Sequence, residues 1–302
     1  MKKALVQLHI AVFLWGFTAV LGRLITLNEG LLVWWRMALT VVTLWVLLLF
    51  QRKVERFGFV SILRASGVGA LVVLHWVFFY GSIKYANASI ALVCLSSSGL
   101  FTSLLEPLFF RRRISLPEIG LGLLCMSGIY CIFQFDPRYK TGIVLGVISA
   151  LLSCLFTLAN KRLVTDHSSS DNVTLYELTG GFVFWSLVLP FYWRFFPSAS
   201  FFPGWADFGW LLLLAWACTV LAFTLSLHAL RKITPFTLTL TYNLEPVYGI
   251  LLAFLVYHEN RYLGGGFYVG FGLIILSVIL QMLRLLHAGS MSSGLSGSER
   301  SA

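Results

Sequence analysis

The sequence predicts an all-α integral membrane protein, and two observations carry that prediction. Hydrophobic residues make up 58% of the 302 residues and charged residues only 11%, which is less than half the charged fraction of a typical soluble domain. The apolar residues also fall into about ten runs, each close to the roughly 20 residues that a helix needs to cross a bilayer. These runs leave no stretch long enough for an extramembrane domain, so soluble catalytic modules are excluded.

The predicted spans follow one another with short polar clusters between them. The first five are expected near residues 5–25, 31–50, 61–83, 88–110 and 116–135, and the second five near 142–163, 174–195, 207–229, 235–257 and 263–286. The runs lack the strict alternation of a membrane barrel, and in lipid a helix satisfies its own backbone groups. No small-residue cleavage site follows the first run, so we expect that run to be retained as a span.

The distribution of basic residues predicts the orientation in the membrane. If the N-terminus lies inside, fifteen Lys and Arg residues fall on the cytoplasmic side and six on the outer side, and cytoplasmic loops are enriched in both residue types. We therefore expect a multi-pass protein of the bacterial inner membrane with both termini in the cytoplasm. The Ser/Gly-rich segment 287–302 is expected to form a disordered cytoplasmic tail.

Internal similarity indicates a duplication. At an offset of 148 residues, identical residues align: Lys84 with Lys232, Leu92 with Leu240, Leu104 with Leu252, Arg113 with Arg261 and Gly122 with Gly270. Because each half has five spans, an odd number, the second half must insert with the opposite orientation. We therefore expect two inverted five-helix repeats, residues 1–135 and 142–286, around a central cavity, as in many secondary transporters.

Several short motifs resemble a known family. The first span contains Leu14-Trp15-Gly16-Phe17-Thr18 followed by Gly22-Arg23, the second contains Arg36 soon after its start, and Pro246-Val247, Glu259 and Gly270 follow in the ninth and tenth. Together they resemble the EamA-type transporters of the drug/metabolite transporter (DMT) superfamily, over about residues 4–284. The resemblance implies a cavity bordered by spans one, three, four, six, eight and nine. The first repeat departs from the pattern, because Ser98 stands at the position of Pro246 and Arg111 at that of Glu259.

Glu245 is the candidate for proton coupling. It lies near the middle of the predicted ninth span, where an ionised carboxylate costs roughly 3 kcal/mol, so we expect it to face a cavity or a partner. Pro246 cannot donate a backbone hydrogen bond, which frees a carbonyl near Tyr242, and Asn243 adds an amide nearby. A structural hydrogen bond or ion pair between helices is the alternative interpretation.

Arg36 in span two occupies the position that Glu177 occupies in span seven, at an offset of 141 residues. The simpler expectation is a direct salt bridge that fixes one bundle against the other. The alternative is that Arg36 binds a substrate carboxylate, because the guanidinium fork matches carboxylate geometry. Trp15 either forms an aromatic wall of the cavity or, together with Gly16, lets a neighbouring helix approach closely.

Further polar and aromatic side chains within the spans complete the candidate set. His75 lies in span three and can change protonation at physiological pH, although a lone membrane histidine more often bonds a neighbouring helix. Ser97 belongs to a serine patch in span four, and Asn160 lies at the inner end of span six. The candidate substrate-binding or cavity residues are Trp15, Arg36, His75, Trp76, Tyr80, Ser97, Asn160, Tyr242, Asn243 and Glu245.

Signals of an enzyme, a cofactor or a metal site are scarce. Gly264-Gly265-Gly266 follows no strand, no Walker sequence is present, and the five cysteines lack metal-ligand spacing. We therefore predict no catalytic residue, no cofactor and no metal. The net charge of +10 is attributed to cytoplasmic loops rather than to nucleic-acid binding. The expected partners are a small-molecule substrate and the lipid bilayer, with a homodimer as an open alternative to a monomer.

The sequence thus favours a secondary transporter that moves a small polar metabolite by alternating access. An amino acid or related compound, exported or exchanged, is the first expectation. An importer or exchanger of sugars, nucleosides or organic cations shares the same features. A membrane-embedded lipid-modifying enzyme is the weaker alternative, because the ionisable residues are scattered over different spans and depths instead of gathering at one interface.

Overall fold

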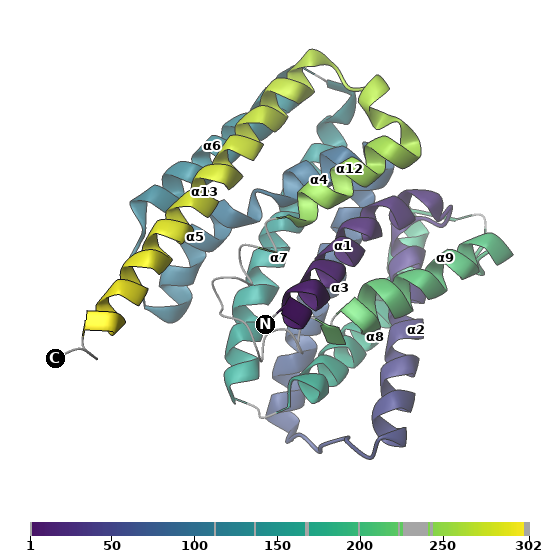
Figure 1. Cartoon of the computed structure of the whole chain (residues 1–302). Coiled ribbons are helices and arrows are strands. Elements are labelled where there is room, and N and C mark those ends of the chain that lie inside the picture. The colour runs from purple at the N-terminus through teal and green to yellow at the C-terminus, as the bar shows by residue number, and fades with distance from the viewer. Residues whose placement is uncertain are drawn as a thin grey trace.

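The computed structural model is helical over most of the residues that it describes (Figure 1). These are residues 2–111, 113–135, 137–166, 169–198, 200–222, 224–225, 241 and 244–298. Within them, eight helices are long and apolar enough to cross a membrane. Two shorter apolar segments, Trp205–Leu221 and Glu245–Tyr257, lie in the predicted eighth and ninth spans. The prediction of an all-helical, multi-pass membrane protein is confirmed.

Asparagine side chains fix where two helices of the first half begin. This half consists of α1 (Lys2–Leu24), α2 (Glu29–Phe50), α3 (Phe59–Tyr85), α4 (Ala88–Leu95), α5 (Ser98–Phe110) and α6 (Leu116–Phe135). Asn28 Oδ1 accepts a hydrogen bond from the backbone nitrogen of Leu31 at 2.9 Å, and Asn87 Oδ1 accepts one from Ile90 at 2.8 Å. Each bond satisfies a backbone donor that the first turn of a helix leaves free, so α2 and α4 begin directly after their asparagines.

The predicted fourth span is two helices rather than one. Ser96 and Ser97 form a turn between α4 and α5. The Ser97 hydroxyl donates to the carbonyl oxygen of Cys94 at 2.6 Å, and Ser96 donates to Leu92 at 3.4 Å. Such local side-chain bonds compete with continuation of the helix, so the serine patch interrupts the span.

The described residues of the second half are also mostly helical. They form η1 (Pro137–Tyr139), α7 (Lys140–Asp166), α8 (Ser170–Phe195), α9 (Trp205–Ala215), the π-helix η2 (Trp216–Leu221), α12 (Glu245–Tyr257), η3 (Glu259–Arg261) and α13 (Gly265–Ser298). α13 continues to Ser298 and so includes most of the segment 287–302, which the sequence predicted as a disordered tail. The extension of an existing helix costs far less than its nucleation, which explains why a Ser/Gly-rich segment can continue it.

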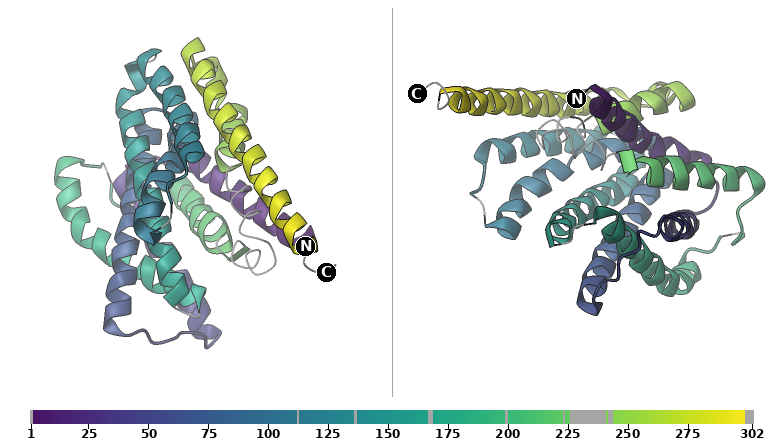
Figure 2. Two further views of the ribbon diagram at one scale, coloured as in Figure 1. Left: turned by 90° about the vertical axis from the view of Figure 1, so that its left-hand side faces the viewer. Right: turned by 60° about the horizontal axis from the view of Figure 1, so that its bottom comes forward.

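The two halves pack through matching pairs of helices. α2 packs on α8, α6 on α13 and α4 on α12, so each of these spans meets its own counterpart. α1 packs on α12, and α7 packs on α4. These two contacts are equivalent, because span one of one half meets span four of the other half in both. Both views in Figure 2 place α13 alongside α6 at one edge of the molecule. The largest buried apolar cluster draws residues from both halves.

Glycines permit close approach at two of these contacts. A Cβ atom on Gly16 of α1 would lie 2.9 Å from the backbone nitrogen of Gly249 in α12. A Cβ atom on Gly128 of α6 would lie 2.5 Å from the carbonyl oxygen of Gly270 in α13. Small residues allow membrane helices to pack backbone to backbone, so these four glycines set the distance between the halves.

The last helix of span four and the helix of span nine are close structural copies. α5 and α12 each contain 13 residues. The residue that caps the C-terminus of α5, Arg111, has φ 52°, and the residue that caps α12, His258, also has φ 52°. The structure therefore aligns these two helices at an offset of 147 residues, one fewer than the sequence predicted, so Ser98 corresponds to Glu245.

Candidate substrate site

A buried arginine joins the two halves of the bundle. Arg36 of α2 is 3% exposed. Its Nη1 atom donates a hydrogen bond to the hydroxyl of Tyr80 on α3 at 2.8 Å. Its Nε and Nη2 atoms donate to the hydroxyl of Thr219 on η2 at 3.1 and 3.0 Å. The Cζ atom lies 3.7 Å from the centroid of the Trp76 ring, a cation–π distance.

Local helix geometry brings these partners to Arg36. Trp76 and Tyr80 are four residues apart on α3 and therefore lie on the same face of that helix. Thr219 lies in a π-helical segment, and its hydroxyl donates to the carbonyl oxygen of Leu214, five residues earlier, at 2.9 Å. π-helical turns are rare and occur frequently at functional sites, which agrees with the place of Thr219 beside a buried charge.

The guanidinium of Arg36 retains donors for a ligand. It has five N–H groups, and three take part in the hydrogen bonds to Tyr80 and Thr219. One N–H on each terminal nitrogen thus has no partner among the described residues, and no carboxylate in the described part of the chain forms an ion pair with it. One turn further along α2, the buried hydroxyl of Thr40 also lacks a described hydrogen-bond partner.

The predicted salt bridge between Arg36 and Glu177 is wrong. Tyr192 near the end of α8 bonds Glu29 at the start of α2, whereas Thr179, earlier in α8, bonds Trp45, which lies later in α2. α2 and α8 are therefore antiparallel, and Glu177 lies level with Trp45, nine residues or about 13 Å along α2 from Arg36. Positions that match in sequence lie at opposite depths when the helices run in opposite directions.

Glu177 and Asn160 form a separate buried pair. The Asn160 Nδ2 atom of α7 donates to Glu177 Oε1 of α8 at 2.9 Å, and the Asn160 Oδ1 atom is buried without a described partner. Asn160 thus bonds Glu177 and not Arg36 or its partners Trp76, Tyr80 and Thr219.

The structure places His75 in a contact between α3 and α7. His75 Nδ1 donates to the carbonyl oxygen of Ser149 at 2.9 Å, and the Ser149 hydroxyl donates back to the carbonyl oxygen of His75 at 3.0 Å. The imidazole also stacks near Phe79, with ring centroids 6.1 Å apart. His75 therefore makes the bond to a neighbouring helix that a lone membrane histidine was expected to make.

Trp15 and Ser97 contact other parts of the chain. Trp15 packs against the buried pair Leu8 and Val12, and its neighbour Gly16 closely approaches Gly249, as expected for a packing role. Ser97 is fully buried and its hydroxyl bonds its own helix turn. Glu245 begins α12, and none of the described residues donates a hydrogen bond to its carboxylate. Tyr242 and Asn243 lie outside the described residues.

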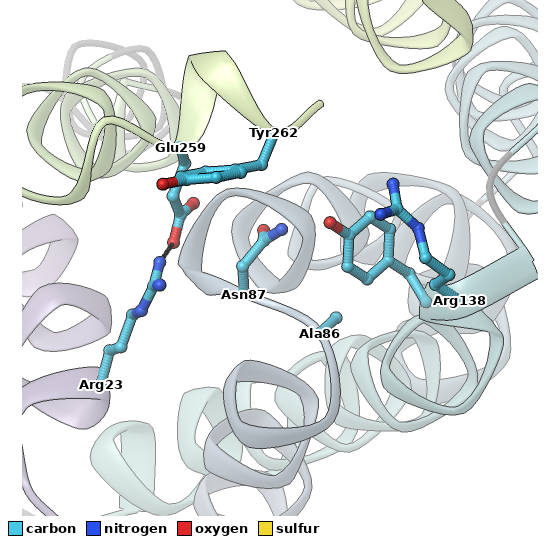
Figure 3. Close-up of a pocket in the computed structure, with 7 residues that line it drawn as sticks. Arg23, Ala86, Asn87, Arg138, Glu259 and Tyr262 are labelled. Atoms are coloured by element: carbon cyan, nitrogen blue, oxygen red, sulfur yellow. Dashed lines mark hydrogen bonds and ion pairs between the residues drawn. The ribbon is translucent and has the colours of Figure 1, made fainter. Parts of the chain in front are cut away.

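A second polar cluster lies where α1 ends and α4 begins. The carboxylate of Glu259, which follows α12, forms an ion pair with Arg23 of α1. It also accepts hydrogen bonds from the backbone nitrogens of Ala88, at 3.2 Å, and Ser89, at 2.9 Å, and from the Ser89 hydroxyl at 2.5 Å. Figure 3 shows Arg23 pointing at Glu259, beside a cavity of about 260 Å³ that Asn87, Arg138 and Tyr262 also line.

Comparison with known proteins gives the family. Residues 2–134 and 140–283 each match the EamA-like transporter family. The chain belongs to this family. The EamA-like family is one of transporters and not of enzymes, and its two matches, one in each half, indicate a duplicated domain. The lipid-modifying enzyme considered from the sequence is therefore set aside.

Individual relatives of this EamA protein are distant. An uncharacterized transporter of Haemophilus influenzae is 24% identical over 177 residues, which are 54% of this chain and 56% of that protein. The chain thus matches about half the length of this curated relative. A solved crystal structure is 16% identical and superposes with a TM-score of 0.61, covering 93% of this chain and 98% of that one. This likeness shows a shared fold.

Sequence reasoning missed two residues of these clusters. Thr219 lies in the apolar run Trp216–Leu221, and a threonine in such a run gives no signal of its own, because a π-helix leaves no pattern in the sequence. Glu259 belonged to the motif that resembles EamA transporters, but the sequence gave no reason to pair it with Arg23. Their separation of 236 residues is bridged only when α1 packs on α12.

Proposed function

We propose that this EamA-family protein is a secondary transporter of a small metabolite that carries a carboxylate, an amino acid or related compound, which it exports or exchanges. The observation that carries the proposal is the buried Arg36, which has two N–H groups without a hydrogen-bond partner and no acidic partner among the described residues. A charged arginine inside a membrane bundle is costly and is retained where it has a function.

The surroundings of Arg36 favour a carboxylate over other ligands. Its free N–H groups lie on the two terminal nitrogens, which is the arrangement that binds both oxygens of one carboxylate. Trp76 covers one face of the guanidinium, so a ligand approaches along the edge of the plane. A sugar, a nucleoside or an organic cation offers no matching anion, and these classes stand as the alternative substrates.

Alternating access fits the burial of this site. Arg36 is enclosed in this conformation, so a substrate reaches it only when the bundle opens. α6 and α13 also pack antiparallel, because Ser277 bonds the carbonyl oxygen of Leu121 at 2.7 Å and Gly270 lies beside Gly128. Together with the antiparallel packing of α2 on α8, this supports two inverted repeats at residues 1–135 and 142–286 around a central cavity. Rocking of such halves exposes a central site to each side in turn. The positive-inside rule places both termini in the cytoplasm of a bacterial cell.

Glu245 is proposed as the proton-coupling group. Glu245 is the first residue of α12, and its backbone carbonyl oxygen lies where Gly16 of α1 approaches this helix. A carboxylate without a described hydrogen-bond donor can exchange its proton more readily than one held by several donors, such as Glu259. Glu245→Gln should therefore abolish the pH dependence of transport, measured as uptake rate across a range of external pH. An unchanged pH profile would remove Glu245 from the coupling mechanism.

Counterflow in proteoliposomes tests the transport proposal. Vesicles are preloaded with mixed unlabelled amino acids, and uptake of a labelled pool is compared with uptake into protein-free vesicles. We expect saturable, protein-dependent accumulation, with an increase of about 100-fold in KM for Arg36→Gln, the effect of losing two hydrogen bonds to a charged group. The matched control Arg194→Gln changes an exposed arginine at the end of α8 and should leave uptake unchanged. Absence of accumulation by folded protein would eliminate amino acids as substrates.

A further inference from the structure

The two halves place equivalent arginines at opposite ends of the bundle. An offset of 139 residues relates Arg23 of α1 to Arg162 of α7, and the offset of 147 relates Tyr257 of α12 to Phe110 of α5. The Cζ atom of Arg23 lies 4.3 Å from the Tyr257 ring centroid, and that of Arg162 lies 5.7 Å from the Phe110 ring centroid. The same cation–π contact thus joins the first half to the second at both ends.

The Arg23 end carries an additional ion pair, in which the carboxylate is buried and the Arg23 side chain is 39% exposed. There Glu259 joins Arg23 of α1 to Ala88 and Ser89 of α4 and is itself 2% exposed. We call these four residues the Glu259 latch. Both carboxylate oxygens are occupied, so the latch has no oxygen left for a substrate ammonium group and acts as a contact between the halves.

Among the described residues, the contacts at the Arg162 end involve more exposed carboxylates and carbonyl oxygens than the latch does. Arg162 donates to the carbonyl oxygen of Phe109 at 2.5 Å, and Lys161 pairs with Glu106 at 3.0 Å through side chains that are 49% and 27% exposed. Solvent-exposed ion pairs contribute little to stability. In the sequence, the offset of 147 assigns Arg112 to the position of Glu259, so a base replaces the acid and the ion pair cannot be repeated there.

We propose that the Glu259 latch is the gate that closes the Arg23 end of the substrate pathway, and that it must break before this end opens. This inference rests on the proposed alternating access. The weaker contact at Arg162 is the corresponding gate at the other end, so the conformation closed at the Arg23 end is the resting state. The predicted topology makes the Arg23 end the outer one.

Spin-label distances at both ends test the latch without a known substrate. One label pair replaces the exposed Tyr85 and Tyr262 near the latch, and a second pair replaces the exposed Leu108 and Asp171 near the other end. Cys131, which is partly exposed, is replaced by alanine, whereas the other four cysteines are buried. Distances are measured by pulsed electron paramagnetic resonance on the full chain in lipid nanodiscs.

Glu259→Gln replaces one carboxylate oxygen by an NH₂ group, which must then face an N–H or O–H donor of the latch. We expect the ratio of the long to the short Tyr85–Tyr262 distance to rise about tenfold, the effect of losing one hydrogen bond to a charged group. Because both gates report one equilibrium, the Leu108–Asp171 pair should gain a shorter distance in an equal fraction of molecules. An unchanged distribution at the latch, or a change there without its match at the other end, would overturn the proposal.

Two further variants separate gating from a loss of stability. Ser89→Ala removes one donor of the latch and should shift both distances in the same directions by a smaller ratio, which keeps the test valid if Glu259→Gln does not fold. Glu118→Gln breaks the Arg284–Glu118 pair between α6 and α13, which is 3.1 Å long with side chains 35% and 38% exposed, and should change neither distance. If the latch opens as expected but the protein shows no amino-acid counterflow, the proposed substrate class is wrong and the proposed gate still holds.

Discussion

The replacement Thr219→Val tests whether hydrogen bonds to Arg36 stabilise the bundle. The Thr219 hydroxyl accepts two hydrogen bonds from Arg36 and donates one to Leu214, which is its full capacity. Valine has nearly the same shape, so the change removes three hydrogen bonds without creating a cavity. Hydrogen bonds between membrane helices contribute about 0.6 kcal/mol on average and up to about 1.7. We therefore expect a loss of about 2 kcal/mol in the free energy of unfolding.

The control Thr219→Ser keeps the hydrogen bonds and reduces apolar burial, the opposite of Thr219→Val. Serine keeps the hydroxyl and loses one methyl group, which costs about 0.8 kcal/mol of apolar burial. Both variants are compared with the native protein by equilibrium unfolding in mixed micelles with sodium dodecyl sulfate. If the hydrogen bonds matter, valine destabilises more than serine. If only apolar burial matters, valine is the better tolerated residue, and that order would refute the reasoning.

The same variant also connects stability to substrate binding. In Thr219→Val, the Nε and one Nη2 N–H group of Arg36 lose their acceptor, so more N–H groups are available to a bound carboxylate. A ligand that binds only the folded state stabilises it by RT ln(1 + L/Kd), where L is the ligand concentration, so tighter binding gives greater stabilisation at the same ligand concentration. A carboxylate substrate should therefore restore more stability to the valine variant than it adds to the native protein. Equal stabilisation of both proteins would argue against a carboxylate at Arg36.

Two contacts between helices give further predictions. Ser149→Ala removes the hydroxyl that bonds the carbonyl oxygen of His75. It should lower the free energy of unfolding by about 0.6 kcal/mol, measured in the same micelles. No loss would show that the hydrogen bond from His75 Nδ1 to the Ser149 carbonyl oxygen suffices. Gly128→Leu forces α6 away from Gly270 and should cost about 3 kcal/mol, whereas Gly120→Leu on the same helix, where a Cβ atom meets nothing within 4 Å, should cost almost nothing. Equal effects at both glycines would contradict the close approach.

Much of the candidate site could be selected from the sequence because polar groups are conspicuous in an apolar chain. Arg36, Trp76 and Tyr80 were all named as cavity candidates, and the structure brings these three together. His75 and Asn160 were selected on the same grounds, yet they bond other partners. Burial of a polar residue in a span predicts that it has a partner, but not which partner, since that depends on how the helices are aligned.

The sequence by itself determined the all-helical, multi-pass membrane class of the protein and its family. Apolar runs of bilayer length must form helices because lipid offers no hydrogen bonds to the backbone, and this rule acts locally on each run. Tertiary structure alone decided the partners of the charges. The antiparallel packing of α2 on α8 separates Arg36 from Glu177, and the π-helical turn brings in Thr219 from 183 residues away. Such contacts depend on helix crossings, which are set by side chains of both halves at once, so no single span encodes them.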